Sequence, residues 1–207
     1  RTVNVDKSFV KWTGKEITTK IHFGKLNISS GNITVDDNGV SGEVKVNMET
    51  LVVEDLQGEW GKKLEGHLKS DDFFSVDKFK ESSIKTTSST KKSDNSYVVQ
   101  GVLTIKDISH PITFDVDVDG NTLNANLTFD RSLYDVRFRS GSFFENLGDK
   151  LIVDDIDLEV TLELNWFIKY IELKKNPSFD GFLIFKFRVY NLKTILFASC
   201  FKSLWFN

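Results

Sequence analysis

The chain has 207 residues, of which 40% are hydrophobic and 28% charged, a balance typical of a folded globular domain and not of a disordered or membrane-embedded chain. Its formal net charge is −3, whereas nucleic-acid-binding proteins normally carry a basic face, so we expect no nucleic-acid partner. The single Cys excludes an internal disulfide framework and a multi-cysteine metal site.

The charges are distributed unevenly along the chain. Residues 166–207 contain 7 Lys and Arg and 2 Asp and Glu, whereas residues 1–165 contain 20 and 28. The later segment also contains 8 of the 18 Phe and the only Cys. We therefore predict one domain over residues 1–165 and a compositionally distinct segment over residues 166–207.

Strands with a period of two are predicted through the first part of the domain. The candidates span residues 8–13, 17–23, 26–35 and 40–48. In the last of these, apolar positions from Val40 to Met48 alternate with polar ones, which is typical of a strand with one buried face. The turn-forming sequence DDNG at residues 36–39 separates this strand from the one before it.

Residues 55–72 interrupt the strand pattern. Leu56, Trp60, Leu64 and Leu68 recur at every fourth position, which indicates a short amphipathic helix or a pair of turns. We expect this helix to pack its apolar stripe over one end of the β structure as a cap.

The period of two returns after the helical segment. The further strand candidates span residues 83–87, 97–106, 112–118, 123–129 and 156–164. The Gly120-Asn121 turn joins two of them into a hairpin. A total of about eight or nine strands predicts an all-β sandwich or barrel. A purely parallel sheet is not expected, because its strands would be apolar on both faces.

The sequence lacks the common motifs of a catalytic or metal site. His22, His67 and His110 do not occur in HxH or HExxH spacing, and no GxSxG, P-loop or GxGxxG motif is found. The acidic residues at 154–157 are of the type that calcium prefers, but they lack the spacing of an EF-hand loop. We therefore predict no catalytic residue, no metal and no cofactor.

Two pairs of adjacent aromatic residues, Phe73-Phe74 and Phe143-Phe144, follow short polar runs. Neighbouring residues of an extended chain point to opposite sides, so both members of a pair cannot enter one core. We expect one member of each pair to face a mouth, a cap or a cavity.

Several segments resemble a known family in the same order along the chain. The sequence GHLKSDDFF at residues 66–74 resembles the HLxSxDFF signature of the YceI-like polyisoprenoid-binding family. The sequence HFG at residues 22–24 is similar to that family's early strand pair. GVLTI at residues 101–105, followed by Pro111, is similar to its GxLTI…P segment.

The segment at residues 130–144, which contains DR, YDV and SGSFF, resembles the variant common in flavobacteria-like sequences. The resemblance covers residues 3–165. It implies a lipocalin-like antiparallel β-barrel that binds a long apolar lipid, such as a polyisoprenoid, an isoprenoid quinone or a fatty-acyl chain, as a carrier, storage or scavenging protein. It further implies a periplasmic or secreted protein that is not an enzyme. A homodimer is compatible with these features.

The expected binding site combines an apolar bore with a polar mouth. A dry bore suits a prenyl or acyl chain, since each buried CH₂ contributes about 0.8 kcal/mol, and an Arg at the mouth could bind a phosphate head group bidentately. The predicted lining residues are Trp12, Ile21, Phe23, Val46, Met48, Phe73, Phe74, Ile105, Phe114, Phe143 and Phe144. The predicted head-group residues are His67, Arg131, Arg137 and Arg139.

Two alternatives remain open. A hydrolase on the same barrel would use His67 with Asp71 and Asp72, and it predicts that these groups converge in a cleft. A surface or stress protein without a ligand would have a fully packed core, and it predicts no cavity large enough for a lipid chain.

The segment at residues 166–207 is aromatic and basic and lies outside the resemblance. Charged residues interrupt its apolar runs, whereas a transmembrane helix needs about 20 nearly uncharged residues, so we expect no transmembrane span. Its richness in Phe, Lys, Ile, Leu and Asn is typical of translated AT-rich non-coding DNA. We therefore expect the natural protein to end near Asn165 and this segment to be translated read-through.

Overall fold

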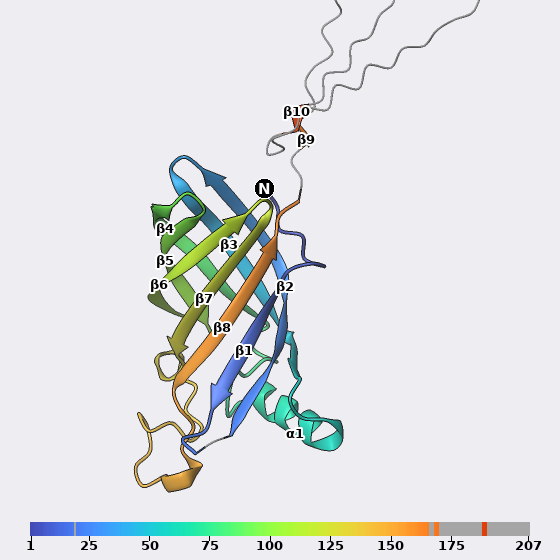
Figure 1. Ribbon diagram of the computed structural model, residues 1–207. Helices are drawn as coiled ribbons and strands as arrows, with labels where there is room; N and C mark the ends of the chain where they lie inside the picture. The colour runs from blue at the N-terminus through green and yellow to red at the C-terminus, as the bar shows by residue number, and fades with distance from the viewer. Residues whose placement is uncertain (19, 166–167, 170–187, 190–207) are drawn as a thin grey trace, which may run out of the picture. The chain divides into compact units, whose positions relative to one another are not determined.

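A computed structural model of the chain describes residues 1–18, 20–165, 168–169 and 188–189. Residues Arg1–Asn165 form a closed antiparallel barrel of eight strands, in which each strand pairs with its neighbours in sequence (Figure 1). The last barrel strand, β8 (Asp155–Glu163), closes the sheet by pairing with β1 (Phe9–Lys15). The predicted all-β barrel of about eight strands is thus confirmed.

Most successive strands are joined by short turns, but a helix lies between the third strand and the fourth, and segment 131–154 lies between the seventh strand and the eighth. Between β1 and β8 lie β2 (Ile21–Asp36), β3 (Gly39–Val53), β4 (Glu81–Ser93), β5 (Ser96–Ile105), β6 (Ile108–Asp119) and β7 (Thr122–Asp130). Burial alternates along them: in β5, Val99 and Leu103 are buried, whereas Gln100 between them is exposed. Apolar residues therefore fill the inner face of the barrel, and polar residues cover the outer face.

β2 replaces two strands that the sequence analysis placed at residues 17–23 and 26–35. It is one strand of 16 residues, and its pairing with β3 shifts register between Lys25 and Asn27 and again between Ile28 and Ser30. Such irregularities bend a strand and increase its twist, which lets a long strand follow the curve of a small barrel. Gly24 lies at the first bend, where a Cβ atom would come within 1.8 Å of the Val52 carbonyl oxygen.

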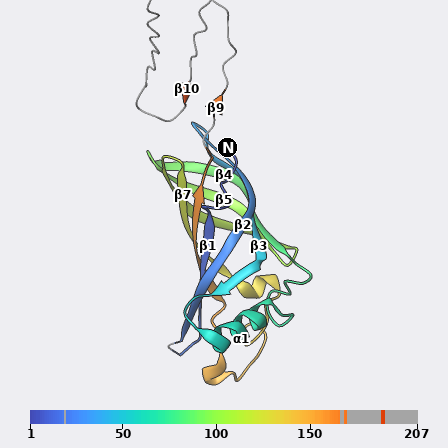
Figure 2. The same cartoon turned by 90° about the vertical axis from the view of Figure 1, so that its right-hand side faces the viewer.

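One helix, α1 (Gly58–Lys69), covers one end of the barrel, as predicted. Figures 1 and 2 show α1 and the segment 131–154 together at this end, opposite to the N-terminus. The β1–β2 turn lies there as well (Figure 1). We call this end of the barrel, formed by the turn, α1 and segment 131–154, the α1 end.

Only part of the expected apolar stripe of α1 packs against the barrel. Leu68 is buried and Leu64 packs against the core, but Trp60 is 72% exposed. At 3.6 residues per turn, each step of four residues rotates by about 40° around the helix axis. A stripe with this spacing therefore turns away from the barrel within two steps, and the prediction was wrong for Trp60.

The strands β6 and β7 pair only at the end remote from α1, over Asp115–Asp119 and Thr122–Asn126. The short 3₁₀ helix η1 (Arg131–Tyr134) packs beside β6 at the α1 end, where the His110 ring nitrogen Nε2 lies 3.0 Å from the Leu133 carbonyl oxygen. A second 3₁₀ helix, η2 (Gly148–Lys150), lies later in the same segment. Segment 131–154 thus supplies part of the wall of the barrel at the α1 end.

In residues 166–207 the structure describes only two short strands, β9 (Ile168–Lys169) and β10 (Arg188–Val189), which pair antiparallel. The prediction that this segment is translated read-through concerns residues that lie largely outside the described ones. Within the described part of the chain, no helix has the length and apolar character needed to cross a membrane.

Candidate functional site: a cavity inside the barrel

The barrel encloses a cavity of about 370 Å³ whose lining includes side chains from all eight strands and from α1. Most of these side chains are aliphatic or aromatic, because the cavity is bounded by the inward positions of the strands. Val99 in β5 and Leu123 in β7 are 1% and 3% exposed and show how thoroughly the walls are shielded from water. The arrangement offers a largely apolar site whose walls are shielded from water.

The basic and imidazole groups of the lining lie at the α1 end. Lys15 at the end of β1, His22 at the start of β2 and His67 in α1 all line the cavity, yet their side chains are 47%, 27% and 35% exposed. At the opposite end, Val3 and Val40 are 5% and 4% exposed. The cavity therefore reaches the surface at the α1 end.

Seven of the eleven predicted lining residues line this cavity. They are Trp12, Val46, Met48, Phe73, Phe74, Ile105 and Phe114. Phe73 also stacks edge-on against His67, with ring centroids 5.0 Å apart. The second member of the pair, Phe74, packs against the core as well, so both residues of this pair contribute to the wall.

Ile21, Phe23, Phe143 and Phe144 do not line the cavity, contrary to the prediction, and are 41% to 51% exposed. At the start of β2 the inward-facing residues are the even-numbered ones, whereas the predicted Ile21 and Phe23 are odd-numbered. His22, Gly24, Leu26 and Ile28 form the inward row, so Ile21 and Phe23 point outward.

Phe143 and Phe144 follow a turn in which both backbone N–H groups donate to the Ser140 carbonyl oxygen. The turn places both rings outside the cavity. Phe138, which precedes it, lines the cavity instead and stacks edge-on on His67 with ring centroids 4.5 Å apart.

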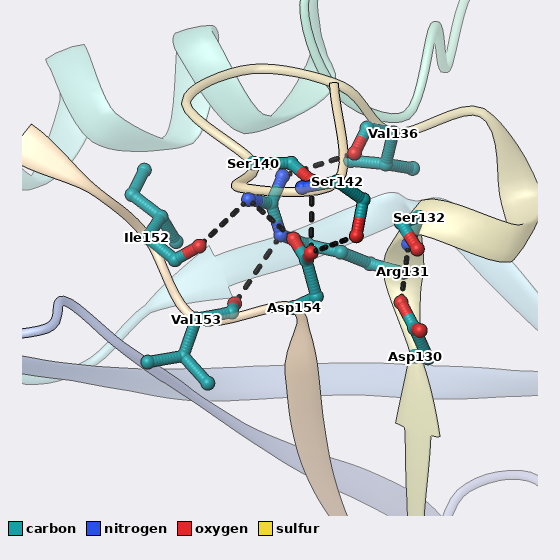
Figure 3. A network of polar contacts seen from close by, with 9 residues as sticks. All are labelled: Asp130, Arg131, Ser132, Val136, Ser140, Ser142, Ile152, Val153 and Asp154. Atoms are coloured by element: carbon teal, nitrogen blue, oxygen red, sulfur yellow. Dashed lines mark hydrogen bonds and ion pairs between the residues drawn. The ribbon is translucent and has the colours of Figure 1, made fainter. Parts of the chain in front are cut away.

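Arg131 lines the cavity, but its guanidinium is hydrogen-bonded to the backbone of segment 131–154 (Figure 3). Its side chain is 1% exposed, and its guanidinium donates to the carbonyl oxygens of Val136, Ile152 and Val153 at 3.0, 3.1 and 3.3 Å. A terminal nitrogen also lies 3.1 Å from Asp154 Oδ1. The nitrogens that a phosphate head group would need are therefore already engaged by the protein.

The burial of Arg131 has an electrostatic consequence. Desolvation lowers its pKa, and the charge of Asp154 acts in the opposite direction. Arginine keeps its charge under such conditions, because its pKa starts far above neutrality. The buried cation thus fixes the three carbonyl groups around it and holds the segment against the barrel.

Asp154 completes this network from the other side. Its Oδ2 accepts hydrogen bonds from the hydroxyl groups of Ser140 and Ser142 at 2.8 and 2.9 Å (Figure 3). Asp157 lies apart from it and pairs with Lys15 at 2.7 Å, which lowers the pKa of Asp157. Among the residues that the structure describes, no group of three His, Cys, Asp or Glu could hold a metal ion.

The other two predicted head-group arginines differ in position. Arg137 does not line the cavity: its side chain is 60% exposed, pairs with Asp135 and lies over the Phe143 ring. Arg139 does line the cavity, and its guanidinium carbon lies 5.1 Å from the centre of the Phe138 ring. Arg139 makes no ion pair with any described residue.

The hydrolase alternative expected His67, Asp71 and Asp72 to converge. His67 Nε2 lies 3.1 Å from Asp72 Oδ2, but Asp71 pairs with Lys78 at 2.8 Å, a contact that lowers the pKa of Asp71. No hydroxyl or thiol of a described residue is hydrogen-bonded to the His67 ring. The structure thus brings His67 and Asp72 together without a nucleophile.

The sequence analysis did not include His22, Lys15 or Glu16 among the site residues. His22 Nδ1 lies 2.8 Å from Asp55 Oδ2, and the other oxygen of that carboxylate accepts the Phe23 backbone N–H. The pair joins the start of β2 to the segment after β3. The parity of Leu26 and Ile28, continued backwards along the strand, would have identified His22 as inward-facing.

A model of the YceI-like domain matches residues 2–164. The chain belongs to the YceI-like family. A UPF0312 protein of Yersinia enterocolitica is 28% identical over 114 residues, which cover 55% of this chain and 57% of that protein. The chain therefore spans about half the length of the curated relatives that it matches.

Two solved structures share the fold of this YceI-like chain. The crystal structure of Burkholderia cenocepacia BcnA has a TM-score of 0.61 and 17% identity, and the match covers 79% of this chain and 99% of BcnA. A polyisoprenoid-binding domain from Saccharophagus degradans, described as implicated in plant cell wall breakdown, has a TM-score of 0.53 and 11% identity over 79% of this chain and 98% of its own. At these identities the similarity concerns the fold.

Proposed function

We propose that this YceI-like barrel binds the chain of a long apolar lipid in its cavity and acts as a carrier, storage or scavenging protein, not as an enzyme. The observation on which the proposal depends is the cavity of about 370 Å³, which has apolar walls and reaches the surface at one end. Its volume falls within the range of about 300–1,000 Å³ that is usual for small-molecule sites. A fully packed core would not leave such a space.

The energetics favour a chain-like ligand. Each CH₂ group moved from water into the cavity contributes about 0.8 kcal/mol. Roughly ten such groups would offset the cost of immobilising the ligand, which is of the order of 4–15 kcal/mol. A prenyl or acyl chain supplies this surface without polar atoms that the walls would leave unpaired.

The head group would lie at the α1 end. Arg139 lines the cavity there without an ion-pair partner among the described residues, and His22 and His67 face the same space. A phosphate, a carboxylate or a quinone carbonyl could accept hydrogen bonds from these groups. The S. degradans neighbour, a polyisoprenoid-binding domain by its description, supports a polyisoprenoid as the chain. We propose a periplasmic or secreted location for this activity.

The test is to identify the lipid that purifies with the full chain by mass spectrometry of an organic extract. Ala125 in β7 lines the cavity, whereas the adjacent Asn126 points to solvent. Ala125→Phe should fill part of the cavity and reduce the bound lipid about tenfold, because its ring displaces several CH₂ groups. Asn126→Phe adds the same ring outside the barrel and serves as the matched control.

A polyprenyl, quinone or acyl species present in stoichiometric amount, lost in Ala125→Phe and kept in Asn126→Phe, would support the proposal and name the ligand class. A blank extract that stays blank after incubation with farnesol or palmitate would overturn it.

A further inference from the structure

The exposed large hydrophobic side chains are gathered at one end of the barrel. Among the described residues they number nine, and all except Val5 belong to the β1–β2 turn, the adjoining ends of β2 and β3, α1, or segment 131–154. Figures 1 and 2 show that these elements together form the α1 end. Val5 follows Asn4, whose backbone N–H donates to the carbonyl oxygen of Glu163 at the end of β8 remote from α1.

The most prominent of these side chains project from separate segments. Trp60 in α1 is 72% exposed, Ile17 in the β1–β2 turn 55%, and Phe144 in segment 131–154 50%. Single exposed hydrophobic residues are normal on a protein surface, but a group of them at one place marks an interaction site. The group here does not form one flat sheet or helix face.

The charges of the same segments differ from those of the rest of the barrel. Residues 15–23, 57–69 and 131–154 contain nine Lys and Arg and seven Asp and Glu. The remainder of residues 1–165 contains 11 Lys and Arg and 21 Asp and Glu. The segments of the α1 end are therefore slightly positive on an otherwise strongly acidic domain, which suits contact with an anionic surface.

Cations and aromatic rings are also paired at this end. Lys63 Nζ lies 5.0 Å from the centre of the Trp60 ring, and the Arg137 guanidinium carbon lies 5.0 Å from that of Phe143. Aromatic rings with a neighbouring Lys or Arg favour the interface between water and lipid, where the ring enters the head-group layer and the cation meets lipid phosphate.

The cavity reaches the surface within this group. Lys15, His22 and Arg139 line the cavity, and each belongs to one of the segments from which the hydrophobic side chains project. The Ile152 N–H donates to the Arg139 carbonyl oxygen, and the Val153 N–H donates to that of Lys15, both at 2.9 Å. Segment 131–154 is thereby fixed beside the β1–β2 turn, so the hydrophobic side chains surround the polar end of the cavity.

We propose that the α1 end docks on the surface of an anionic lipid bilayer, with Ile17, Trp60, Phe143 and Phe144 entering the head-group layer, and that lipid passes between bilayer and cavity at this end. A bilayer fits better than a flat protein partner because separate apolar tips, mixed with cations, project from the segments that also line the apolar cavity. The passage of lipid rests on the proposed function, whereas docking does not.

The experiment is flotation of the full chain with vesicles of phosphatidylcholine containing a quarter phosphatidylglycerol. The test variant combines Ile17→Ser, Trp60→Ser and Phe144→Ser, and the matched control is Val5→Ser at the opposite end. We expect the bound fraction to fall about tenfold in the triple variant and to stay within about twofold in the control, because each lost apolar tip removes surface buried in the interface. Residues 166–207 are present in every protein, so any contribution of theirs is common to all.

Three results would overturn the docking proposal. The first is failure of the parent chain to float with the vesicles, and the second is equal flotation of the parent and the triple variant. The third is a dimer that light scattering detects in the parent and not in the triple variant, which would make this end a contact between two copies of the chain.

Loading with farnesol from ethanol, without vesicles, separates this inference from the proposed function. The triple variant should take up farnesol from ethanol as the parent does, and only its uptake from vesicles should slow. If neither protein takes up farnesol or palmitate from ethanol while the parent still floats, the proposed function fails and docking stands.

Discussion

Arg131 shows how a charged side chain is accommodated in the wall of an apolar cavity. Three carbonyl oxygens and the Asp154 carboxylate surround the guanidinium, which also lies over the Phe73 ring with its carbon 5.8 Å from the centroid. The charge satisfies backbone groups that a long irregular segment would otherwise leave unpaired. Arg131 thus holds part of the cavity wall in place, and residues such as Arg139 remain available to bind a ligand head group.

Replacing Arg131 with Met should strongly destabilise the barrel. The variant keeps much of the side-chain volume but leaves three carbonyl groups without their donors and Asp154 without its cation. Removal of one partner from a buried ion pair costs about 3–5 kcal/mol in the free energy of unfolding. Urea denaturation of Arg131→Met against the parent measures the loss.

Arg137→Met is the control for that change, because the Arg137–Asp135 pair is exposed. Exposed pairs contribute about 0–1 kcal/mol. A loss of less than about 1 kcal/mol in Arg131→Met would show that the network in Figure 3 does not stabilise the fold.

His22 and Phe23 show why strands are easier to predict from sequence than the faces of those strands. The apolar Ile21 and Phe23 favour one parity, while Leu26 and Ile28 favour the other. Leu26 and Ile28 lie within the paired part of the sheet and are buried, whereas Ile21 and Phe23 lie near the start of β2 and are exposed, so the former set the inward face. Only the structure shows that the exposed Phe23 belongs to the group of hydrophobic side chains at the α1 end.

At the scale of elements, bends in the strands let the barrel close. Gly24 lies where β2 approaches β3 and Trp12, and a Cβ atom there would come within 2.9 Å of the Trp12 ring as well as 1.8 Å of the Val52 oxygen. The sequence pattern predicts two separate strands at residues 17–23 and 26–35, and Gly24 lies between them. The glycine instead permits a close approach within one continuous strand.

Gly24→Ala should therefore be destabilising, whereas Gly66→Ala in α1 should be stabilising. No atom lies within 4 Å of a Cβ at Gly66, and alanine is favoured over glycine in a helix by about 1 kcal/mol. We expect Gly24→Ala to lose about 2 kcal/mol or more, because the β2–β3 contact must shift to admit the methyl group. Thermal and urea unfolding of both variants provide the measurement, and equal stabilities would show that the bend at Gly24 tolerates a side chain.

At the scale of the whole molecule, alternation along the strands was sufficient to predict an all-β sandwich or barrel with an apolar interior, and the family resemblance indicated the barrel. The alternation could not predict whether that interior is filled, because the same inward residues suit a packed core and a hollow one. Whether the interior is hollow depends on small inward residues such as Ala125 and Gly42, which line the cavity and leave space inside the barrel. Periodicity could not predict the position of segment 131–154 either, because that position depends on specific contacts such as those of the buried Arg131 side chain.

A hollow barrel that binds a lipid should be stabilised by that lipid. A ligand at about 100 times its Kd contributes about 2.7 kcal/mol to the free energy of unfolding. For a domain of this size each kcal/mol shifts Tm by about 2–4 °C, so delipidated protein should gain about 5–10 °C when farnesol or palmitate is restored. Differential scanning calorimetry of the delipidated chain with and without the added lipid measures the shift.

The variants Ala125→Phe and Asn126→Phe test whether this shift in Tm comes from lipid bound in the cavity. Asn126→Phe should keep the full shift, because its new ring lies outside the barrel, whereas Ala125→Phe should lose most of it. Ala125→Phe in the absence of lipid need not be unstable, since its ring fills space that the parent leaves to the ligand. A shift of equal size in both variants would place the lipid on the outer surface of the protein, and the cavity would then have no part in binding it.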